Sequence, residues 1–239
     1  MVKNNKFLKV KISLLIIVSV LFLNTNTFGQ GSESSDYQGS VTFGLTHSFH
    51  FTTITGQFPS LNLGNRQTSI STAAPRFTFS IGMTADYYVS SKFSVQFDFL
   101  YTYIGAHLVS KTFLYNEVGV IENREYYTYA MDYFKFPLTL NYYPMPKLYV
   151  NGGGYFATLI SSSKYNHWFD SREPIDNIKP FDYGLVVGFG FNTKYAKFGF
   201  QYSYGFNNFI DNPKYNLHHN VFELTVRWKF YSDLRKKGL

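Results

Sequence analysis

The chain has 239 residues, of which 21% are aromatic and only 15% are charged, and it contains no cysteine. The lack of cysteine excludes a disulfide scaffold, and 26 Phe and 21 Tyr beside two Trp are not the composition of an ordinary soluble domain. The formal net charge is +7, but no basic stripe with interleaved stacking residues accompanies it, which argues against nucleic-acid binding.

The first 29 residues differ in composition from the rest. Four lysines precede an apolar run from Ile12 to Leu23, and a polar segment follows that ends at Gly29. The run is too short to span a bilayer, so we expect residues 1–29 to be a cleaved secretory signal peptide, with an uncleaved anchor as the alternative. Its removal lowers the net charge to +3, because four lysines and no acidic residue leave. We expect residues 30–38 to form an N-terminal periplasmic segment.

The remaining chain alternates bulky apolar residues with small, polar or charged ones, with a period of two residues. Such alternation is typical of β-strands. Because the second face is too rich in glycine and charge for the exposed side of a soluble lipocalin-like barrel, the bulky face suits lipid. We therefore predict an all-β fold, an eight-stranded antiparallel up-and-down transmembrane β-barrel, over residues 39–231. The predicted strands are 41–51, 77–87, 93–103, 133–142, 148–160, 181–191, 198–207 and 222–230.

Long and short connections alternate along the chain. Residues 52–75, 105–131, 161–180 and 208–220 are predicted long loops, whereas turns near 90–92, 144–147 and 193–197 are short. This pattern predicts an outer-membrane barrel with external long loops, periplasmic turns and both termini in the periplasm, including a basic tail at 232–239. A periplasmic aromatic girdle is expected from Tyr142, Tyr143, Tyr149, Tyr195, Trp228 and Tyr231.

Several motifs resemble one family. The segment YFKFPL at 133–138, the run GGGY at 152–155, DYG at 182–184 and YSYG at 202–205 are similar to the small outer-membrane β-barrel domain of Bacteroidota, which includes the PorT-like proteins of type IX secretion. The resemblance implies an accessory role in protein secretion or outer-membrane protein biogenesis. Lys135 departs from the pattern, because family members often carry an acidic residue in the strand just before an Ile-Pro pair, whereas this chain has Lys135 before Phe136-Pro137.

An eight-stranded barrel has an interior that side chains can fill, which argues against a diffusion pore. By alternation, seven charged residues point inward. We expect five of them to pair, Asp86 with Arg227 and Asp98 with Glu223 and Lys135. A proton or ion path is the alternative. The predicted charge plug comprises Asp86, Asp98, Lys135, Asp182, Glu223, Arg227 and Lys229.

Two residues interrupt the strand pattern. Pro137 has no N–H to donate to a sheet ladder, so we predict a bulge or a weakened seam with a neighbouring strand at this position. His47 is a strongly polar residue on an apolar outward face, which places it at the lipid headgroups or at a lateral protein interface.

Catalytic and metal sites are not indicated. The histidines at 47, 50, 107, 167, 218 and 219 form no evident Ser/His/acid arrangement, and a group near Asp211, His218, His219 and Glu223 is explained as a solvated loop. We expect no cofactor and no enzyme. The predicted function is an accessory subunit of an envelope assembly that contacts membrane lipid, lipopolysaccharide and other outer-membrane or periplasmic proteins. A surface receptor or adhesin is the alternative, ahead of a lipid-modifying enzyme or protease.

Overall fold

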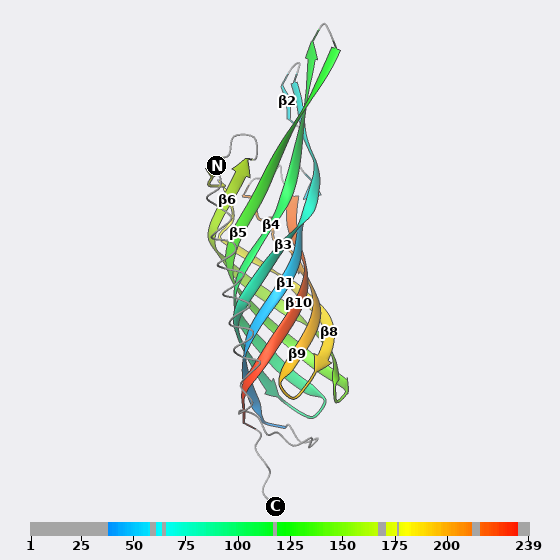
Figure 1. Cartoon of the computed structure of the whole chain (residues 1–239), viewed down its shortest axis with the longest axis vertical. Coiled ribbons are helices and arrows are strands. Elements are labelled where there is room, and N and C mark those ends of the chain that lie inside the picture. The colour runs from blue at the N-terminus through cyan, green and yellow to red at the C-terminus, as the bar shows by residue number, and fades with distance from the viewer. Residues whose placement is uncertain are drawn as a thin grey trace, which may run out of the picture.

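A computed structural model describes residues 38–57, 61–63, 66–116, 119–166, 171–175, 177–211 and 216–233 (Figure 1). The predicted signal peptide, almost all of the N-terminal segment and residues 234–239 of the basic tail lie outside these ranges. The strands are β1 (Val41–Gln57), β2 (Leu61–Leu63), β3 (Arg66–Tyr88), β4 (Phe93–Asn116), β5 (Gly119–Met145), β6 (Leu148–Asn166), β7 (Ser171–Glu173), β8 (Phe181–Asn192), β9 (Ala196–Gly205) and β10 (Asn216–Asp233).

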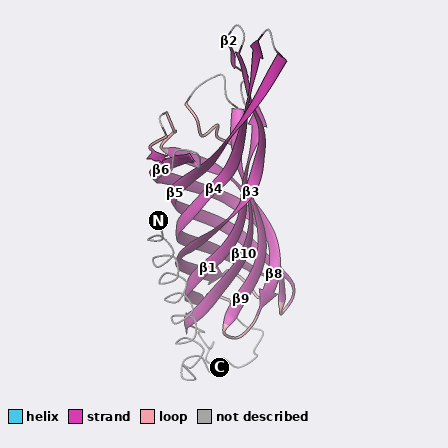
Figure 2. Ribbon diagram, turned by 45° about the horizontal axis from the view of Figure 1, so that its top comes forward, coloured by secondary structure: helices cyan, strands magenta, loops and turns pink. Residues whose placement is uncertain are grey.

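Eight of these strands form a closed barrel. They pair in the order β1-β10-β9-β8-β6-β5-β4-β3, every pair is antiparallel, and pairing of β3 with β1 closes the ring (Figure 2). The two short strands only extend it, because β2 pairs with β3 and β7 pairs with β6. The predicted eight-stranded up-and-down barrel is therefore confirmed. No helix in the described ranges is long and apolar enough to span a membrane.

The alternation in sequence becomes an alternation of faces. In β8, Phe181 and Tyr183 are each 51% exposed on the outer wall, whereas Asp182 between them is 2% exposed in the interior. The other barrel strands present bulky residues outward and small or polar ones inward in the same way, because successive residues of a strand point to opposite faces. The barrel thus has an apolar outer wall and a largely polar interior.

The two ends of the barrel differ. At the end that we call the turn end, residues 89–92, 146–147 and 193–195 join neighbouring strands. Ser90 accepts bonds from the N–H groups of Lys92 and Phe93, and Thr193 bonds Ala196 through its hydroxyl and its N–H. These local bonds explain how the strands reverse within a few residues. We call the opposite end the hairpin end.

Two predicted long loops are largely β-structure, which corrects the sequence-based expectation. Residues 105–131 form a hairpin in which β4 and β5 pair from Gly105↔Ala130 to Asn116↔Gly119. β1 and β3 also extend into the segment that was predicted as the first loop. The reason is composition, because Val, Ile, Thr and Tyr in these segments favour strands despite the lost alternation.

The hairpin end therefore carries a sheet that continues past the barrel (Figure 1). We call it the projecting sheet and define it as β2 with residues 66–72 of β3, 109–116 of β4 and 119–126 of β5. Within the described part of the chain, β6 pairs with β5 only from Tyr127 onward, so β5 has no neighbour other than β4 beyond that point.

Pro137 weakens one seam without a bulge. Pairing of β4 with β5 stops at Phe97↔Leu138 and resumes at Leu100↔Lys135 in the same register. On its other side, Pro137 pairs with Tyr155 of β6 in an unbroken run. The predicted bulge at Pro137 is wrong, whereas the interrupted seam is present, as expected for a residue without an N–H donor.

Candidate functional site: the filled lumen and the projecting sheet

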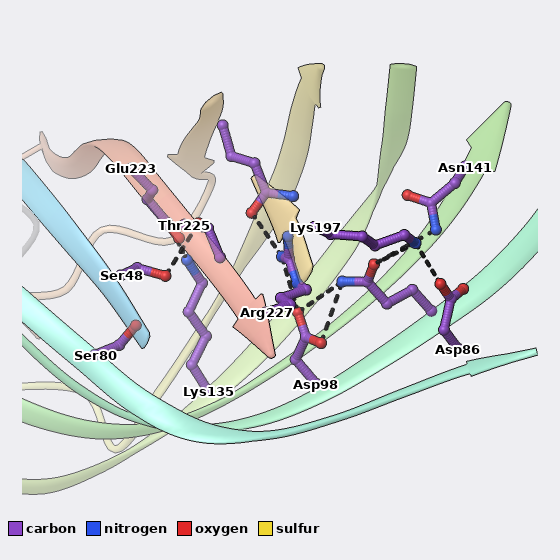
Figure 3. Close-up of polar contacts among 12 residues, drawn as sticks. Ser48, Ser80, Asp86, Asp98, Lys135, Asn141, Lys197, Glu223, Thr225 and Arg227 are labelled. Carbon is purple, nitrogen blue, oxygen red and sulfur yellow. Dashed lines mark hydrogen bonds and ion pairs between the residues drawn. The ribbon is translucent and has the colours of Figure 1, made fainter. Parts of the chain in front are cut away.

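Three ion pairs lie in the barrel interior (Figure 3). Their side chains are at most 6% exposed, so water does not screen them appreciably. The Nζ–Oε1 distance of the first pair is 2.6 Å, and the guanidinium of the third lies 3.1 Å from its carboxylate. The pairs are Lys135 with Glu223, Lys197 with Asp86, and Arg227 with Asp98.

These partners correct part of the predicted plug. Lys135 does contact Glu223, but Asp86 pairs with Lys197 rather than with Arg227, and Arg227 binds Asp98. Lys197 was missed because it was assigned to a turn, whereas β9 begins at Ala196 and carries Lys197 inward. The signal was available, since Lys197 precedes the outward-facing Phe198 in an alternating segment.

Two residues of the predicted plug lie outside these ion pairs. Lys229 donates to Asn192 Oδ1 at 2.5 Å and to the carbonyl of Thr193 at 2.8 Å, near the turn end. Asp182 accepts a hydrogen bond from the Tyr155 hydroxyl at 2.9 Å.

Polar side chains join the ion pairs to one another. Gln96 donates to both carboxylate oxygens of Asp98 and accepts a bond from Lys197, so it connects two pairs. Ser203 accepts a hydrogen bond from Lys135 and donates one to Glu223, so it bonds both members of the first pair. The middle of the lumen is therefore occupied by a network of side chains.

A tyrosine layer fills the turn end. Tyr88, Tyr143 and Tyr149 are at most 4% exposed and surround the Lys197 ammonium, which lies 5.8, 5.4 and 5.1 Å from their ring centres. Cation–π attraction and the Asp86 carboxylate together stabilise this buried charge.

The predicted girdle requires correction. Tyr143 and Tyr149 point into the lumen, because each follows an outward residue by one position, whereas Tyr142 and Tyr195 are 39% and 60% exposed. Trp228 lies on the outer wall, and the side chain of Tyr231 lies outside the described part of the structure.

Tyr149 fits into a recess that two glycines provide. A Cβ added to Gly190 or to Gly199 would lie 2.7 Å from its hydroxyl oxygen. The absence of a side chain at both positions leaves room for the hydroxyl end of Tyr149 against β8 and β9.

An apolar layer fills the lumen at the hairpin end. This layer was not predicted from the alternation in sequence. Its centre is Phe209, which comes from the β9–β10 connection, is 1% exposed and stacks on His219 with 4.4 Å between ring centres. The layer also contains Ile54, Ile104, Ala106, Met131, Tyr133, Tyr155, Ala157, Val186, Leu217 and Val221. Alternation could have revealed the strand residues, but not the inward turn of a loop phenylalanine.

Backbone hydrogen bonds hold Phe209 in place. Its N–H donates to Leu217 O at 3.2 Å, and its carbonyl accepts from Lys179 at 2.8 Å. Ile178 and Ile210 form a β-bridge, so two connections at the hairpin end are joined to each other. We call this segment, residues 177–180 and 207–211, the cap.

One buried cluster contains the residue types of a hydrolase. His50 Nε2 lies 3.1 Å from Ser80 Oγ and 3.8 Å from Glu223 Oε2. Both contacts use the same nitrogen, whereas a catalytic relay needs the acid and the nucleophile on opposite ring nitrogens. His50 is fully buried in the lumen, so the cluster fits a structural network better than a catalytic one.

The other predicted positions are separate from one another. His218 bonds Gly205 O and Asn216, whereas His219 stacks beneath Phe209 and Glu223 binds Lys135, so the suggested group near the last loop does not converge. The described residues contain no group of three or more potential metal ligands.

His47 lies on the outer wall. It is partly buried, stacks on Trp228 with 6.4 Å between ring centres, and contacts Phe49 edge to face. These contacts fit its amphipathic ring into the aromatic outer surface.

The projecting sheet presents a different surface. Tyr126 is 45% exposed and Arg124 is exposed. At its base, Lys164 lies 4.2 Å from the Tyr127 ring centre, and Arg76 donates to the Tyr103 hydroxyl at 2.6 Å. Where the sheet leaves the barrel, basic side chains thus contact tyrosines.

Solved structures that are similar to this chain include outer-membrane barrels. The attachment invasion locus protein Ail of Yersinia pestis is 12% identical, covers 81% of this chain and 99% of its own, and has a TM-score of 0.43. Neisserial surface protein A is 10% identical with coverage of 81% and 100% and a TM-score of 0.43. OprG of Pseudomonas aeruginosa is 12% identical with coverage of 82% and 97% and a TM-score of 0.36.

Comparison with protein families is more direct. No curated protein matches the chain. The family profile described as outer membrane protein beta-barrel domain matches residues 28–211, which is most of the chain. The chain therefore belongs to the outer membrane protein β-barrel domain family and is an outer-membrane β-barrel.

Proposed function

We propose that this protein is a non-enzymatic surface barrel that binds a protein partner through the projecting sheet. The observation that carries the proposal is a contrast within one molecule. The lumen is filled by tyrosines, ion pairs and the apolar layer that includes Phe209 of the cap. By contrast, β4 and β5 continue beyond the barrel as a paired hairpin, from Val109 and Tyr126 to Asn116 and Gly119. A filled barrel leaves its outer surfaces for recognition.

The orientation forms part of the proposal. The start of β1 and the end of β10 lie at the turn end, where Val41 pairs with Asp233. Barrels of this class keep short turns in the periplasm and longer connections outside. Both termini are then periplasmic, the projecting sheet faces the medium, and the outer wall contacts membrane lipid and lipopolysaccharide.

The absence of enzymatic activity is also proposed. It is supported by the His50 cluster, in which Ser80 and Glu223 contact one nitrogen, and by the layers above and below it. A substrate would have to displace side chains that hold the lumen together.

An accessory subunit of an envelope assembly is the second candidate. The segment YFKFPL at 133–138 supports it through resemblance to the PorT-like proteins of Bacteroidota. In that case the protein would act in protein secretion or in outer-membrane protein biogenesis. A partner would then contact the turn end or the outer wall, where His47 offers a lateral contact.

Site-specific photo-crosslinking in living cells separates the two candidates. A photoreactive amino acid replaces Tyr126 in the projecting sheet or Tyr195 at the turn end, both of which are exposed. Surface binding predicts protein adducts from position 126 and none from position 195. Adducts from position 195 alone would favour the accessory subunit, and lipid adducts alone at both positions would overturn both candidates.

A further inference from the structure

A small cavity lies between two layers of the lumen. Its volume is about 20 Å³, and its walls include Lys135 of the ionic layer together with Tyr133 and Val221 of the apolar layer. One water molecule needs roughly 10–15 Å³ of such space. The cavity is therefore large enough for a guest of that size and too small for an organic ligand.

Three polar atoms at this cavity have no hydrogen-bond partner among the described residues. They are Thr102 Oγ1, Asp182 Oδ1 and His219 Nε2, and their residues line the cavity while being only 2%, 2% and 3% exposed. The other carboxylate oxygen of Asp182 is already bonded to Tyr155. Three buried polar groups from β4, β8 and β10 thus face one small space, and leaving them unpaired is costly.

We propose that the cavity binds one water molecule that bridges these three atoms. Water can donate to the carboxylate and to the imidazole nitrogen while it accepts from the threonine hydroxyl, and two to four such bonds are usual for a buried water. The proposal is independent of the partner that the projecting sheet binds.

A monovalent cation fits the same space less well. Hard cations prefer several oxygen ligands, but here one of the three atoms is an imidazole nitrogen. Lys135 also lines the cavity, and its positive charge would repel a second cation.

The bridging water has a structural consequence. His219 lies directly beneath Phe209 of the cap, and Asp182 bonds Tyr155, over whose ring Lys135 lies at 4.8 Å. The water therefore connects the cap to the ionic layer across three strands that do not neighbour one another.

A crystal structure of the full chain from crystals soaked in rubidium chloride tests the proposal. The expected result is a peak of water size within hydrogen-bond distance of all three atoms, without anomalous signal from rubidium. A rubidium signal at this position would overturn the proposal in favour of a cation, and absence of a peak in a map that shows other buried waters would overturn it in favour of a dry cavity.

A pair of matched variants gives a second test. Thr102→Val removes one hydroxyl from the cavity, whereas Thr139→Val removes a hydroxyl that is equally buried and unpaired but lies away from the cavity. Thr102→Val is expected to shift the unfolding equilibrium in lipid vesicles about fivefold more than Thr139→Val, because it alone breaks a hydrogen bond. Equal shifts for the two variants would contradict the bridging water.

Discussion

The barrel lumen and the projecting sheet are built from the same strands in opposite surroundings. Asp98 of β4 and Lys135 of β5 are at most 5% exposed and each holds an ionic partner. Nearer the start of β5, Arg124 and Tyr126 are exposed. One hairpin therefore forms part of the barrel with the base of its two strands and presents a separate surface where the strands approach their turn.

This division separates stability from recognition. Substitutions in the lumen should change the free energy of unfolding, because buried charges and apolar side chains lose their partners there. Changes in the projecting sheet should alter binding and leave the barrel intact.

Glu223→Gln is expected to have the largest effect. It leaves the Lys135 ammonium buried without a carboxylate, which should lower the free energy of unfolding by about 3–5 kcal/mol. Denaturant unfolding in lipid vesicles measures the change. A double variant, Lys135→Met with Glu223→Leu, should recover most of the loss, and failure to recover it would show that the pair itself is not the cause.

Phe209→Ala tests the cap. Loss of a buried aromatic side chain should cost about 3 kcal/mol, measured in the same unfolding assay. Tyr126→Ala is the matched control from the projecting sheet and should change stability by less than about 0.5 kcal/mol. Similar losses for the two variants would mean that the cap adds no more to stability than the projecting sheet.

Pro137→Ala should change stability by less than about 1 kcal/mol, because a restored hydrogen bond is offset by a more flexible unfolded chain. The informative measurement is amide hydrogen exchange. The new N–H at position 137 should be protected, since Asp98 lies opposite it in the register that flanks the gap. Rapid exchange there would show that something other than proline interrupts the seam.

Removal of the projecting hairpin should have the smallest effect on folding. Replacing residues 110–125 by Asn-Gly joins Val109 to Tyr126, which face each other in the ladder, through a two-residue turn. Stability should stay within about 0.5 kcal/mol of the parent, while the crosslinks from position 126 should disappear. A large loss of stability would show that the sheet supports the barrel.

Much of the barrel could be predicted from sequence. The period of two residues identified all eight barrel strands and their outward faces, because a membrane barrel needs the same alternation in every strand. The segments at 105–131 were missed as strands, since outside the membrane neither face must be apolar and the alternation fades.

The interior was harder to predict. Alternation identifies which residues point inward, but the stagger between strands decides which of them meet, and a single sequence does not show it. Asp86 was assigned the wrong partner for this reason and because Lys197, with which it pairs, had been assigned to a turn. Phe209 was missed for another reason, because it enters the lumen from a connection where alternation gives no information.

The recess at Tyr149 involves three positions that lie far apart in sequence. At Gly199 the nearest atom to an added Cβ is the Tyr149 hydroxyl oxygen, so a larger residue there requires a smaller one at 149. At Gly190 a Cβ would also lie 2.0 Å from the backbone oxygen of Phe198, so that position requires glycine whatever residue stands at 149. Side-chain volume at this level of the lumen can therefore be exchanged between β6 and β9 but not with β8. A different filling of the turn end would have to change residues 149 and 199 together.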